Sequence, residues 1–197
     1  PGLEMRFMKQ TMNIKSRLAV WLASTVVCAA PYQAIIAAPA ASETSASAWF
    51  QGFNNKARLI AGQASGGPHG ASPMTYAGLE IEMPAGWKTY WRNPGEAGGI
   101  PPEFDLEGSE NLESATVLYP VPQRLTDKAG SNIGYKDRVI FPIGIMAKDK
   151  TKGVKLKVKA AYGVCKESCV PAEAKLGIDV LAGAAPSQEL ADVLQAV

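Results

Sequence analysis

The stretch VKLKVKAAYGV at residues 154–164 decides the fold, because apolar and polar side chains alternate along it. A repeat of two residues places successive side chains on opposite faces of an extended chain, so the pattern predicts a β-strand with one buried and one solvated face. Lysines on the solvated face also discourage pairing with the edge of another sheet. The buried positions are Val154, Leu156, Val158, Ala160, Tyr162 and Val164, and the solvated lysines are Lys155, Lys157 and Lys159.

Shorter stretches on both sides have the same extended character and indicate further strands. The chain contains 19 glycines and 14 prolines, which favour many turns and short strands over long helices. Strands that alternate regularly with helices are absent, so the sequence predicts an all-β fold, a β-sandwich, rather than a parallel sheet. The expected strands are 58–61, 75–83, 87–92, 115–119, 138–146 and 174–181, and a C-terminal helix is expected over 186–197 with Ser187 as its N-cap and Leu190, Val193 and Leu194 as its apolar stripe.

The first forty residues have the pattern of an export signal. Lys15 and Arg17 precede an uncharged, mostly apolar run over 18–30, which is shorter than the about 20 residues that a membrane-spanning helix needs. We therefore expect a signal peptide that is removed from the exported chain. The expected divisions are a signal peptide over 1–40, a flexible lead-in over 41–56, a sandwich domain over 57–183 and a helical tail over 184–197 that can continue into a longer protein.

Charge and histidine content exclude several classes of function. Lys and Arg total 20 and Asp and Glu total 18, so the formal net charge is +2. This balance argues against a nucleic-acid-binding protein that relies on a basic surface. A single histidine, His69, excludes a histidine-rich metal site within one chain. The absence of a G-x-S-x-G motif argues against a serine hydrolase.

Cysteine spacing gives the strongest chemical signal. Cys28 lies within the expected signal peptide, which leaves Cys165 and Cys169 as a pair in the loop between two strands. Cysteines at this spacing in a hairpin can reach the Cα separation of about 4.4–6.8 Å that a disulfide requires. A disulfide across so short a loop stabilises the fold little, and a short exposed loop suits a bond that exchanges. We interpret the two cysteines as a redox-active pair that cycles between dithiol and disulfide.

Three alternatives remain open from the residues alone. The disulfide can be an inert element of a β-sandwich binding module that has no enzymatic activity. The two sulfurs can instead hold Cu(I) in a copper-handling protein, with Met74, Met83 or Met146 as further ligands, although methionines in strands are usually core residues. The aromatic residues of 87–91, WKTYW, can form a ligand platform, but such residues more often pack in the core.

Three segments resemble one known family. They are GWKTYWRNPGEAGGIPPEFD (86–105), GYKDRVIFPI (134–143) and YGVCKESCVPAEAKL (162–176). Together they resemble the N-terminal periplasmic domain of DsbD-type thiol–disulfide interchange proteins, in particular the branch that includes ScsB-like proteins. The resemblance covers about residues 55–182. It implies an immunoglobulin-like β-sandwich in the periplasm, with two active cysteines on a hairpin at one end.

The resemblance also implies a function as a thiol–disulfide oxidoreductase component. Such a domain takes electrons from a thioredoxin-like or membrane-embedded thiol reductase domain and passes them to periplasmic client proteins, without a cofactor. Cys165 and Cys169 match the family's two active cysteines. The family pattern makes Cys169 the residue joined to the client in the mixed disulfide, and Cys165 the residue that resolves it.

The sequence departs from the family in how the disulfide is shielded. Better-known members cover it with a loop that carries an aromatic residue, whereas residues 126–130 here contain none. They also separate their cysteines by more than the three residues found here. The candidates for shielding are therefore Leu125, Asp127, Ile133 and Tyr135.

Overall fold

The structure, a computed structural model, describes residues 46–64, 74–127, 130–183 and 188–194. The signal peptide expected over 1–40, Cys28, His69 and the expected N-cap Ser187 lie outside these ranges.

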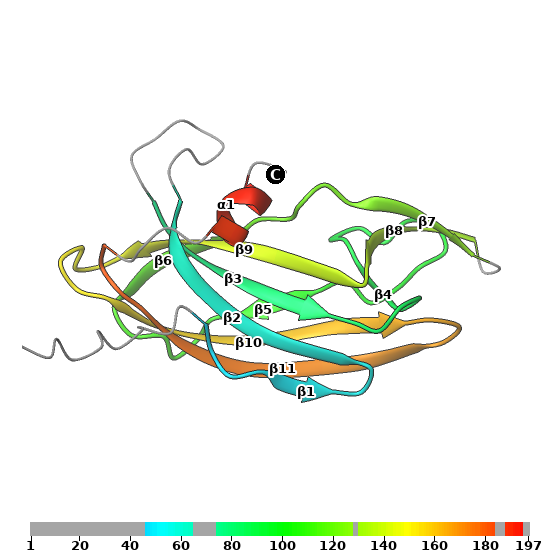
Figure 1. The fold of residues 1–197 in the computed structure, drawn as a ribbon, viewed down its shortest axis with the longest axis horizontal. Helices are drawn as coiled ribbons and strands as arrows, with labels where there is room; N and C mark the ends of the chain where they lie inside the picture. The colour runs from blue at the N-terminus through cyan, green and yellow to red at the C-terminus, as the bar shows by residue number, and fades with distance from the viewer. Residues whose placement is uncertain (1–45, 65–73, 128–129, 184–187, 195–197) are drawn as a thin grey trace, which may run out of the picture. The chain divides into compact units, whose positions relative to one another are not determined.

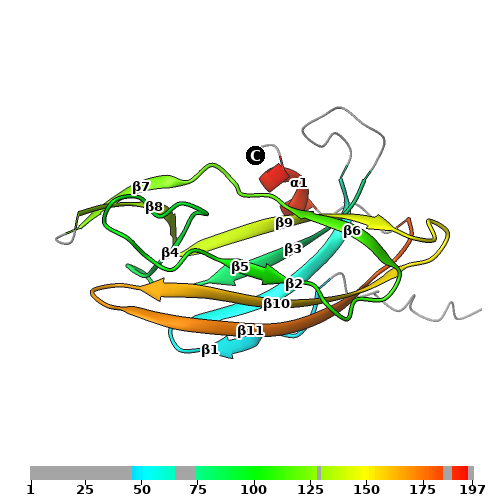
Figure 2. The same cartoon turned by 180° about the vertical axis from the view of Figure 1, so that it is seen from behind.

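Eleven strands in the described residues form two antiparallel sheets (Figure 1). The five-stranded sheet has the order β1-β2-β3-β9-β6, and the six-stranded sheet has the order β11-β10-β4-β8-β7, with β5 paired to β10 beside β4 (Figure 2). The first sheet contains β1 Phe50–Gly52, β2 Asn55–Ala64, β3 Met74–Glu82, β6 Leu112–Val117 and β9 Arg138–Ala147. The second contains β4 Lys88–Tyr90, β5 Glu103–Asp105, β7 Gln123–Asp127, β8 Gly130–Lys136, β10 Val154–Cys165 and β11 Cys169–Val180.

The core lies between the two sheets and is built by the alternation that the sequence shows. Every second residue of β10 from Val154 to Val164 is buried, and Lys155, Lys157 and Lys159 between them are exposed. Phe141 from β9 and Tyr162 from β10 are among the largest fully buried side chains. The all-β fold is confirmed, and the two facing antiparallel sheets form an immunoglobulin-like β-sandwich.

One short helix, α1 Gln188–Leu194, follows the sandwich in the described residues. Leu190 and Leu194 are buried against Ile60, Tyr76 and Ile140 of the five-stranded sheet, on the face opposite the main core. Gly78 leaves the room that Leu190 needs, because a Cβ at Gly78 would lie 3.0 Å from Leu190 Cδ1. The predicted C-terminal helix is thus confirmed, and its apolar stripe is what attaches it to the sheet.

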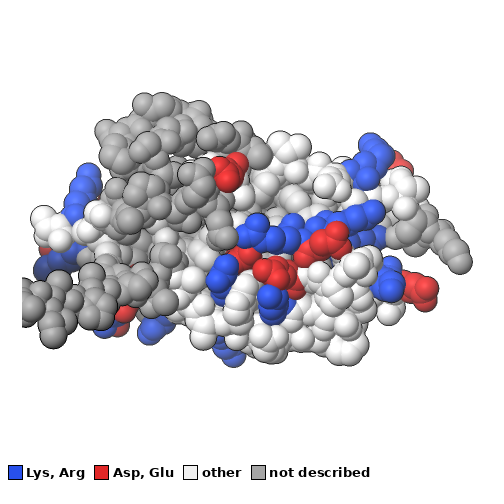
Figure 3. Space-filling model, in the orientation of Figure 1, with Lys and Arg blue, Asp and Glu red and all other residues white. Residues whose placement is uncertain are grey.

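The rest of this outer face carries paired charges, which appear as adjoining basic and acidic groups (Figure 3). Glu80 of β3 is fully buried, and it accepts 2.6 Å contacts from Arg58 on β2 and Arg138 on β9. Lys56 and Glu82 form a further pair at 2.7 Å. Opposite charges on adjacent strands therefore satisfy a carboxylate that would otherwise be costly to bury.

Several segments differ from the expectations. Part of the expected lead-in is ordered in a sheet: β1 pairs with β2, and Ala46 bridges to Ile60. The strand expected over 174–181 begins earlier, at Cys169, and so includes Pro171. A proline is tolerated there because β11 lies at the edge of its sheet. The expected strand over 87–92 is shorter, since β4 covers only Lys88–Tyr90. Strands β5, β7 and β8 lack strong alternation and were not expected.

Candidate functional site

The two cysteines close the hairpin between β10 and β11. Cys165 is the last residue of β10, Cys169 is the first of β11, and the two lie directly opposite each other with Cα atoms 4.1 Å apart. They form a disulfide around a loop of three residues, in which the Lys166 amide donates to the Ser168 carbonyl at 3.2 Å. The regular pairing of β10 and β11 continues directly behind the disulfide, from Val164 opposite Val170.

The two sulfur-bearing residues differ in exposure. Cys165 is only 1% exposed, whereas Cys169 is exposed. The topology explains this difference, because Cys165 lies between β11 and Lys88 of β4, while Cys169 begins a strand at the edge of the sheet. A reagent or partner protein in solution can therefore reach Cys169 more readily than Cys165.

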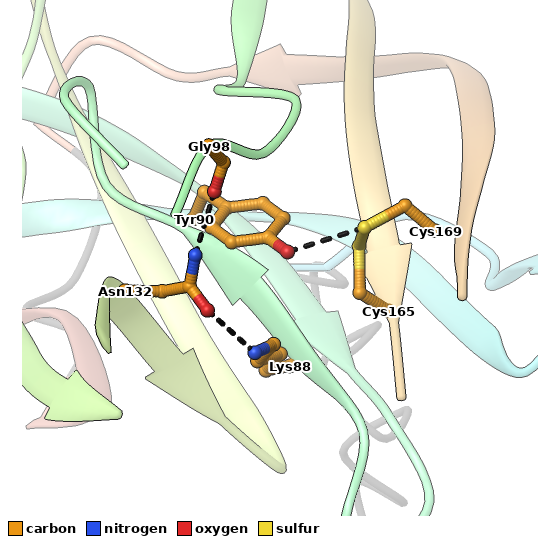
Figure 4. Close-up of a disulfide and its surroundings, with 6 residues drawn as sticks. All are labelled: Lys88, Tyr90, Gly98, Asn132, Cys165 and Cys169. Carbon is orange, nitrogen blue, oxygen red and sulfur yellow. Dashed lines mark hydrogen bonds between the residues drawn. A yellow bond between two sulfur atoms is a disulfide. The ribbon is translucent and has the colours of Figure 1, made fainter. Parts of the chain in front are cut away.

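Tyr90 of β4 contacts the accessible cysteine. Its hydroxyl lies 3.2 Å from Cys169 Sγ (Figure 4). A disulfide sulfur carries no proton, so the tyrosine hydroxyl is the donor in this state. The ring is 3% exposed and lies against Gly99, where a Cβ would be 2.5 Å from Tyr90 Cε1. Gly99 also has a φ of 147°, so both the space and the backbone conformation favour glycine here.

A buried network of hydrogen bonds lies beside Tyr90. Lys88 is 7% exposed, and its Nζ donates to Asn132 Oδ1 at 2.8 Å and lies 5.9 Å from the Tyr90 ring centroid. Asn132 Nδ2 in turn donates to the Gly98 carbonyl at 2.6 Å (Figure 4). Strands β4 and β8 thus place a lysine, a tyrosine and an asparagine next to the disulfide and connect them to the segment 91–102.

Segment 91–102, between β4 and β5, covers the site. The Gly163 amide donates to the Ile100 carbonyl at 3.1 Å, and a Cβ at Gly163 would lie 2.8 Å from Ile100 Cβ. Gly163 and Cys165 are two residues apart on β10 and so share one face of the sheet, the face opposite the core residues Tyr162 and Val164. The glycines of this segment therefore let its backbone lie close over β10 and help to bury Cys165.

The four residues expected to shield the disulfide occupy different environments. Leu125 is buried, and Tyr135 is buried in the core, where its hydroxyl donates to the Pro120 carbonyl at 2.8 Å. Burial raises the pKa of Tyr135 above its usual value. Ile133 is half-buried and holds segment 91–102 through its backbone, accepting from the Trp91 amide and donating to the Pro94 carbonyl. The backbone of Asp127 lies opposite Gly130. A direct shielding role for these four residues stays a prediction.

Sequence reasoning missed the role of Tyr90 and of segment 91–102. The aromatic cluster WKTYW suggested core packing, and Trp87 and Trp91 do pack against the main core. Tyr90 lies two residues from Lys88, and this spacing places both on the other face. Nothing in the sequence indicates that segment 91–102 folds over that face, so the contact with Cys169 could not be predicted.

The methionines considered as copper ligands are dispersed. Met83 is buried in the core, Met146 is 47% exposed, and the side chain of Met74 is outside the described part of the structure. Met146 lies eight residues along β9 from Arg138, the first residue of that strand, and the preceding Asp137 amide donates to the Trp87 carbonyl next to β4. That separation amounts to about 26 Å along a strand. Among the described residues, no group of three or more His, Cys, Asp or Glu side chains is placed to hold a metal ion.

Two comparisons place the chain among known proteins. The model of the family described as thiol:disulfide interchange protein DsbD, N-terminal, matches residues 69–179. Among solved structures, the N-terminal periplasmic domain of ScsB from Proteus mirabilis has a similar fold, with a TM-score of 0.58 and 21% sequence identity. The match covers 78% of this chain and 60% of that one. No curated protein matches the sequence significantly.

The family match includes the hairpin with both cysteines and all of β4, β8 and segment 91–102, which together build the site. Within the described ranges, no helix is long and apolar enough to cross a membrane. Because the match spans more than half of the sequence, the chain belongs to the family of N-terminal domains of the thiol:disulfide interchange protein DsbD, and it is a thiol–disulfide interchange domain.

Proposed function

We propose that Cys165 and Cys169 are the redox-active pair of a periplasmic domain that passes electrons from a membrane-linked reductant to client proteins. The observation that carries the proposal is the difference between the two sulfurs. Cys169 is exposed and hydrogen-bonded by Tyr90, while Cys165 is buried behind it. This arrangement gives an incoming thiolate one accessible sulfur to attack and one sulfur to displace.

In the loading step, a thiolate of the reductant attacks Cys169 Sγ. The disulfide breaks, its electron pair leaves on the Cys165 sulfur, and a mixed disulfide joins Cys169 to the reductant. The second thiolate of the reductant then attacks its own sulfur in that mixed disulfide and releases Cys169. Two electrons and two protons have passed to this domain, which becomes a dithiol while the reductant becomes a disulfide.

In the delivery step, the same chemistry runs towards the client. The Cys169 thiolate attacks a client disulfide and displaces one client thiolate. Cys165 then attacks Cys169 Sγ, restores the intramolecular disulfide and releases the second client thiolate. The two residues lie opposite each other on paired strands, so resolution needs no large movement of the backbone. No cofactor takes part in either step.

Tyr90 supports the thiolate that forms on Cys169. A hydrogen bond donated to a charged sulfur favours the charged form, so the Tyr90 hydroxyl should favour the thiolate of Cys169 in the dithiol. The hydroxyl is already 3.2 Å from Sγ in the disulfide form. The donor that would stabilise the Cys169 thiolate is therefore already in place before the disulfide is reduced.

The location and the partners are part of this proposal, and the family match supports them. The similar solved domain is described as periplasmic, and the signal peptide proposed over 1–40 would deliver this chain to the same compartment. The reductant we propose is a thioredoxin-like or membrane-embedded thiol reductase domain. The clients would be periplasmic proteins that contain disulfides. The sandwich domain proposed over 57–183 would carry the chemistry, and the tail over 184–197 would attach to its outer face through α1.

Trapping tests the proposal directly. A Cys165→Ser variant, mixed with a thioredoxin-like protein in its disulfide form, should accumulate a mixed disulfide through Cys169, seen as a shift on a non-reducing gel. Cys169→Ser is the matched control and should trap far less, because Cys165 is buried. A redox titration of the unaltered domain in glutathione tests the alternative that the disulfide is inert and structural. A pair that stays oxidised below about −300 mV would be an inert structural disulfide and would overturn the proposal.

A further inference from the structure

Lys88 is an unusual residue to find buried. The residue is 7% exposed, although lysine is almost never fully buried unless a partner satisfies its ammonium group. Asn132, itself 3% exposed, accepts from Nζ at 2.8 Å. Burial of this side chain costs conformational entropy and hydration, and a neutral side chain of similar length would fill the same space at a lower cost.

The position of Lys88 relates it to both cysteines. Its backbone lies opposite Cys165 on the neighbouring strand. Its Nζ lies 5.9 Å from the centroid of the Tyr90 ring, whose hydroxyl is 3.2 Å from Cys169 Sγ. Figure 4 shows the lysine and the tyrosine on the same side of the disulfide, with the tyrosine hydroxyl directed at Cys169. A cation at a phenol ring draws electron density from the hydroxyl and makes it a stronger donor.

Resting on the function proposed above, we propose that Lys88 is a positioning residue for thiol–disulfide exchange. Its buried ammonium group, fixed by Asn132, strengthens the Tyr90 hydroxyl as a donor and so favours the thiolate of Cys169. Asn132 also binds the Gly98 carbonyl, and the neighbouring Gly99 lies on the Tyr90 ring. Lys88, Asn132 and segment 91–102 therefore hold the ring from two sides.

The remaining charges near the hairpin are in contact with water, so their effect on Cys169 is reduced by solvent screening. The charged side chains of the neighbouring segments, all exposed, are Lys166 and Glu167 in the hairpin loop, Arg92 and Glu96 in segment 91–102, and Lys136 on β8. Lys136 lies directly opposite Lys88. Replacing Lys136 by methionine is a matched control, because the substitution removes the same charge from the same pair of strands.

The test follows the pH dependence of Cys169 alkylation in the reduced protein, with iodoacetamide as the probe and mass spectrometry to locate the product. In Lys88→Met the midpoint of the Cys169 profile should rise by about one pH unit, which is a roughly tenfold loss of thiolate at neutral pH. Lys88→Arg should stay close to the unaltered protein, and Lys136→Met should leave the midpoint unchanged. An unchanged midpoint in Lys88→Met, or an equal rise in Lys136→Met, would overturn the proposal.

A double-mutant cycle tests whether the effect passes through Tyr90. In a Tyr90→Phe background, Lys88→Met should cause little further change, whereas fully additive shifts would show that the lysine acts independently of the tyrosine and would refute the positioning role. If Lys88→Met does not fold, Asn132→Ala tests the proposal in its place and should also raise the midpoint of the Cys169 alkylation profile. A domain that exchanges normally in glutathione but shows no Lys88 effect refutes this inference alone. A pair that does not exchange refutes the proposed function itself.

Discussion

The two ends of strand β10 are closed by different chemistry. At its start, the connection 148–153 from β9 is held by the side chain of Asn111, which donates to the carbonyls of Asp149, Lys152 and Gly153 and accepts from the Asp149 amide. At its end, the turn to β11 is held by the Cys165–Cys169 disulfide and one hydrogen bond within the loop. One turn has many weak bonds, and the other has one strong bond that a thiol can break.

This difference separates stability from chemistry. Loss of any one hydrogen bond at the Asn111 end leaves the others in place, so that turn is secured redundantly. The disulfide closes a ring of only five residues and therefore adds little chain-entropy stabilisation. Its presence is explained better by exchange than by a need for stability. Substitutions at either end of β10 test whether one end supplies stability and the other supplies thiol–disulfide exchange.

The largest effect is expected from Cys169→Ser. Removal of the accessible sulfur should reduce thiol–disulfide exchange to the uncatalysed background, while the free energy of unfolding falls by no more than about 2 kcal/mol. Insulin reduction coupled to a thioredoxin-like reductant measures the first quantity, and urea unfolding measures the second. Ser168→Ala, in the same loop, should exchange normally. A Cys169→Ser protein that unfolds completely would show that the disulfide is primarily structural.

The converse result is expected from Asn111→Ala. Loss of its side-chain hydrogen bonds, together with a φ of 61° that alanine adopts poorly, should cost about 2–4 kcal/mol of stability. Exchange at the distant cysteines should be unaffected. Urea unfolding compares this variant with Asn111→Gly, which tolerates the backbone conformation and isolates the side-chain contribution. A matching loss of exchange activity would contradict the separation of the two ends.

A smaller effect is expected from Gly163→Ala. The added Cβ would collide with Ile100 at 2.8 Å, so segment 91–102 should move away from β10 and expose Cys165. The disulfide should then be reduced several-fold faster by dithiothreitol, because the rate of exchange depends on access to the sulfurs. Gly177→Ala is the control on the partner strand, where the added Cβ makes an ordinary 3.7 Å contact with the Leu156 carbonyl. Equal reduction rates in both variants would argue against a cover over Cys165.

The smallest effect concerns acid stability at the Asn111 end. The side-chain hydrogen bond from Thr151, aided by Lys152, lowers the pKa of Asp149 from 3.8 to about 2. A carboxylate whose pKa is lowered by folding contributes stability that is present above about 3.8 and is lost as the pH falls through about 2. Unfolding midpoints in urea at pH 5, 3 and 2 should therefore decline less steeply in Asp149→Asn than in the unaltered protein. The redox properties should be the same in both.

Strong alternation made most of the sandwich predictable. The lysine row of β10 and the apolar residues between them gave its position almost to the residue, since a buried face specifies the register of a strand. Weaker patterns failed for a physical reason. The segment CVPAEAKL at the start of β11 contains small residues and a proline, so little in it distinguishes an edge strand from a loop.

The site was only partly predictable. The spacing of Cys165 and Cys169 indicated a disulfide in a hairpin, and the structure contains it. The contacts of Tyr90 and Lys88 depend on how segment 91–102 crosses a neighbouring strand. Alternation along one strand identifies which side chains share a face, but it does not identify which distant segment covers that face. Tyr90 is therefore a residue that only the three-dimensional arrangement reveals.

The continuous pairing of β10 and β11 behind the disulfide has a consequence for repeated turnover. Val164 and Val170 lie opposite each other next to the cysteines, and the ladder runs without interruption to Val154 and Val180. Breaking the sulfur–sulfur bond therefore leaves the rest of the ladder paired, and both redox forms can keep the same backbone. A domain built this way can break and re-form its disulfide without refolding the hairpin that carries it.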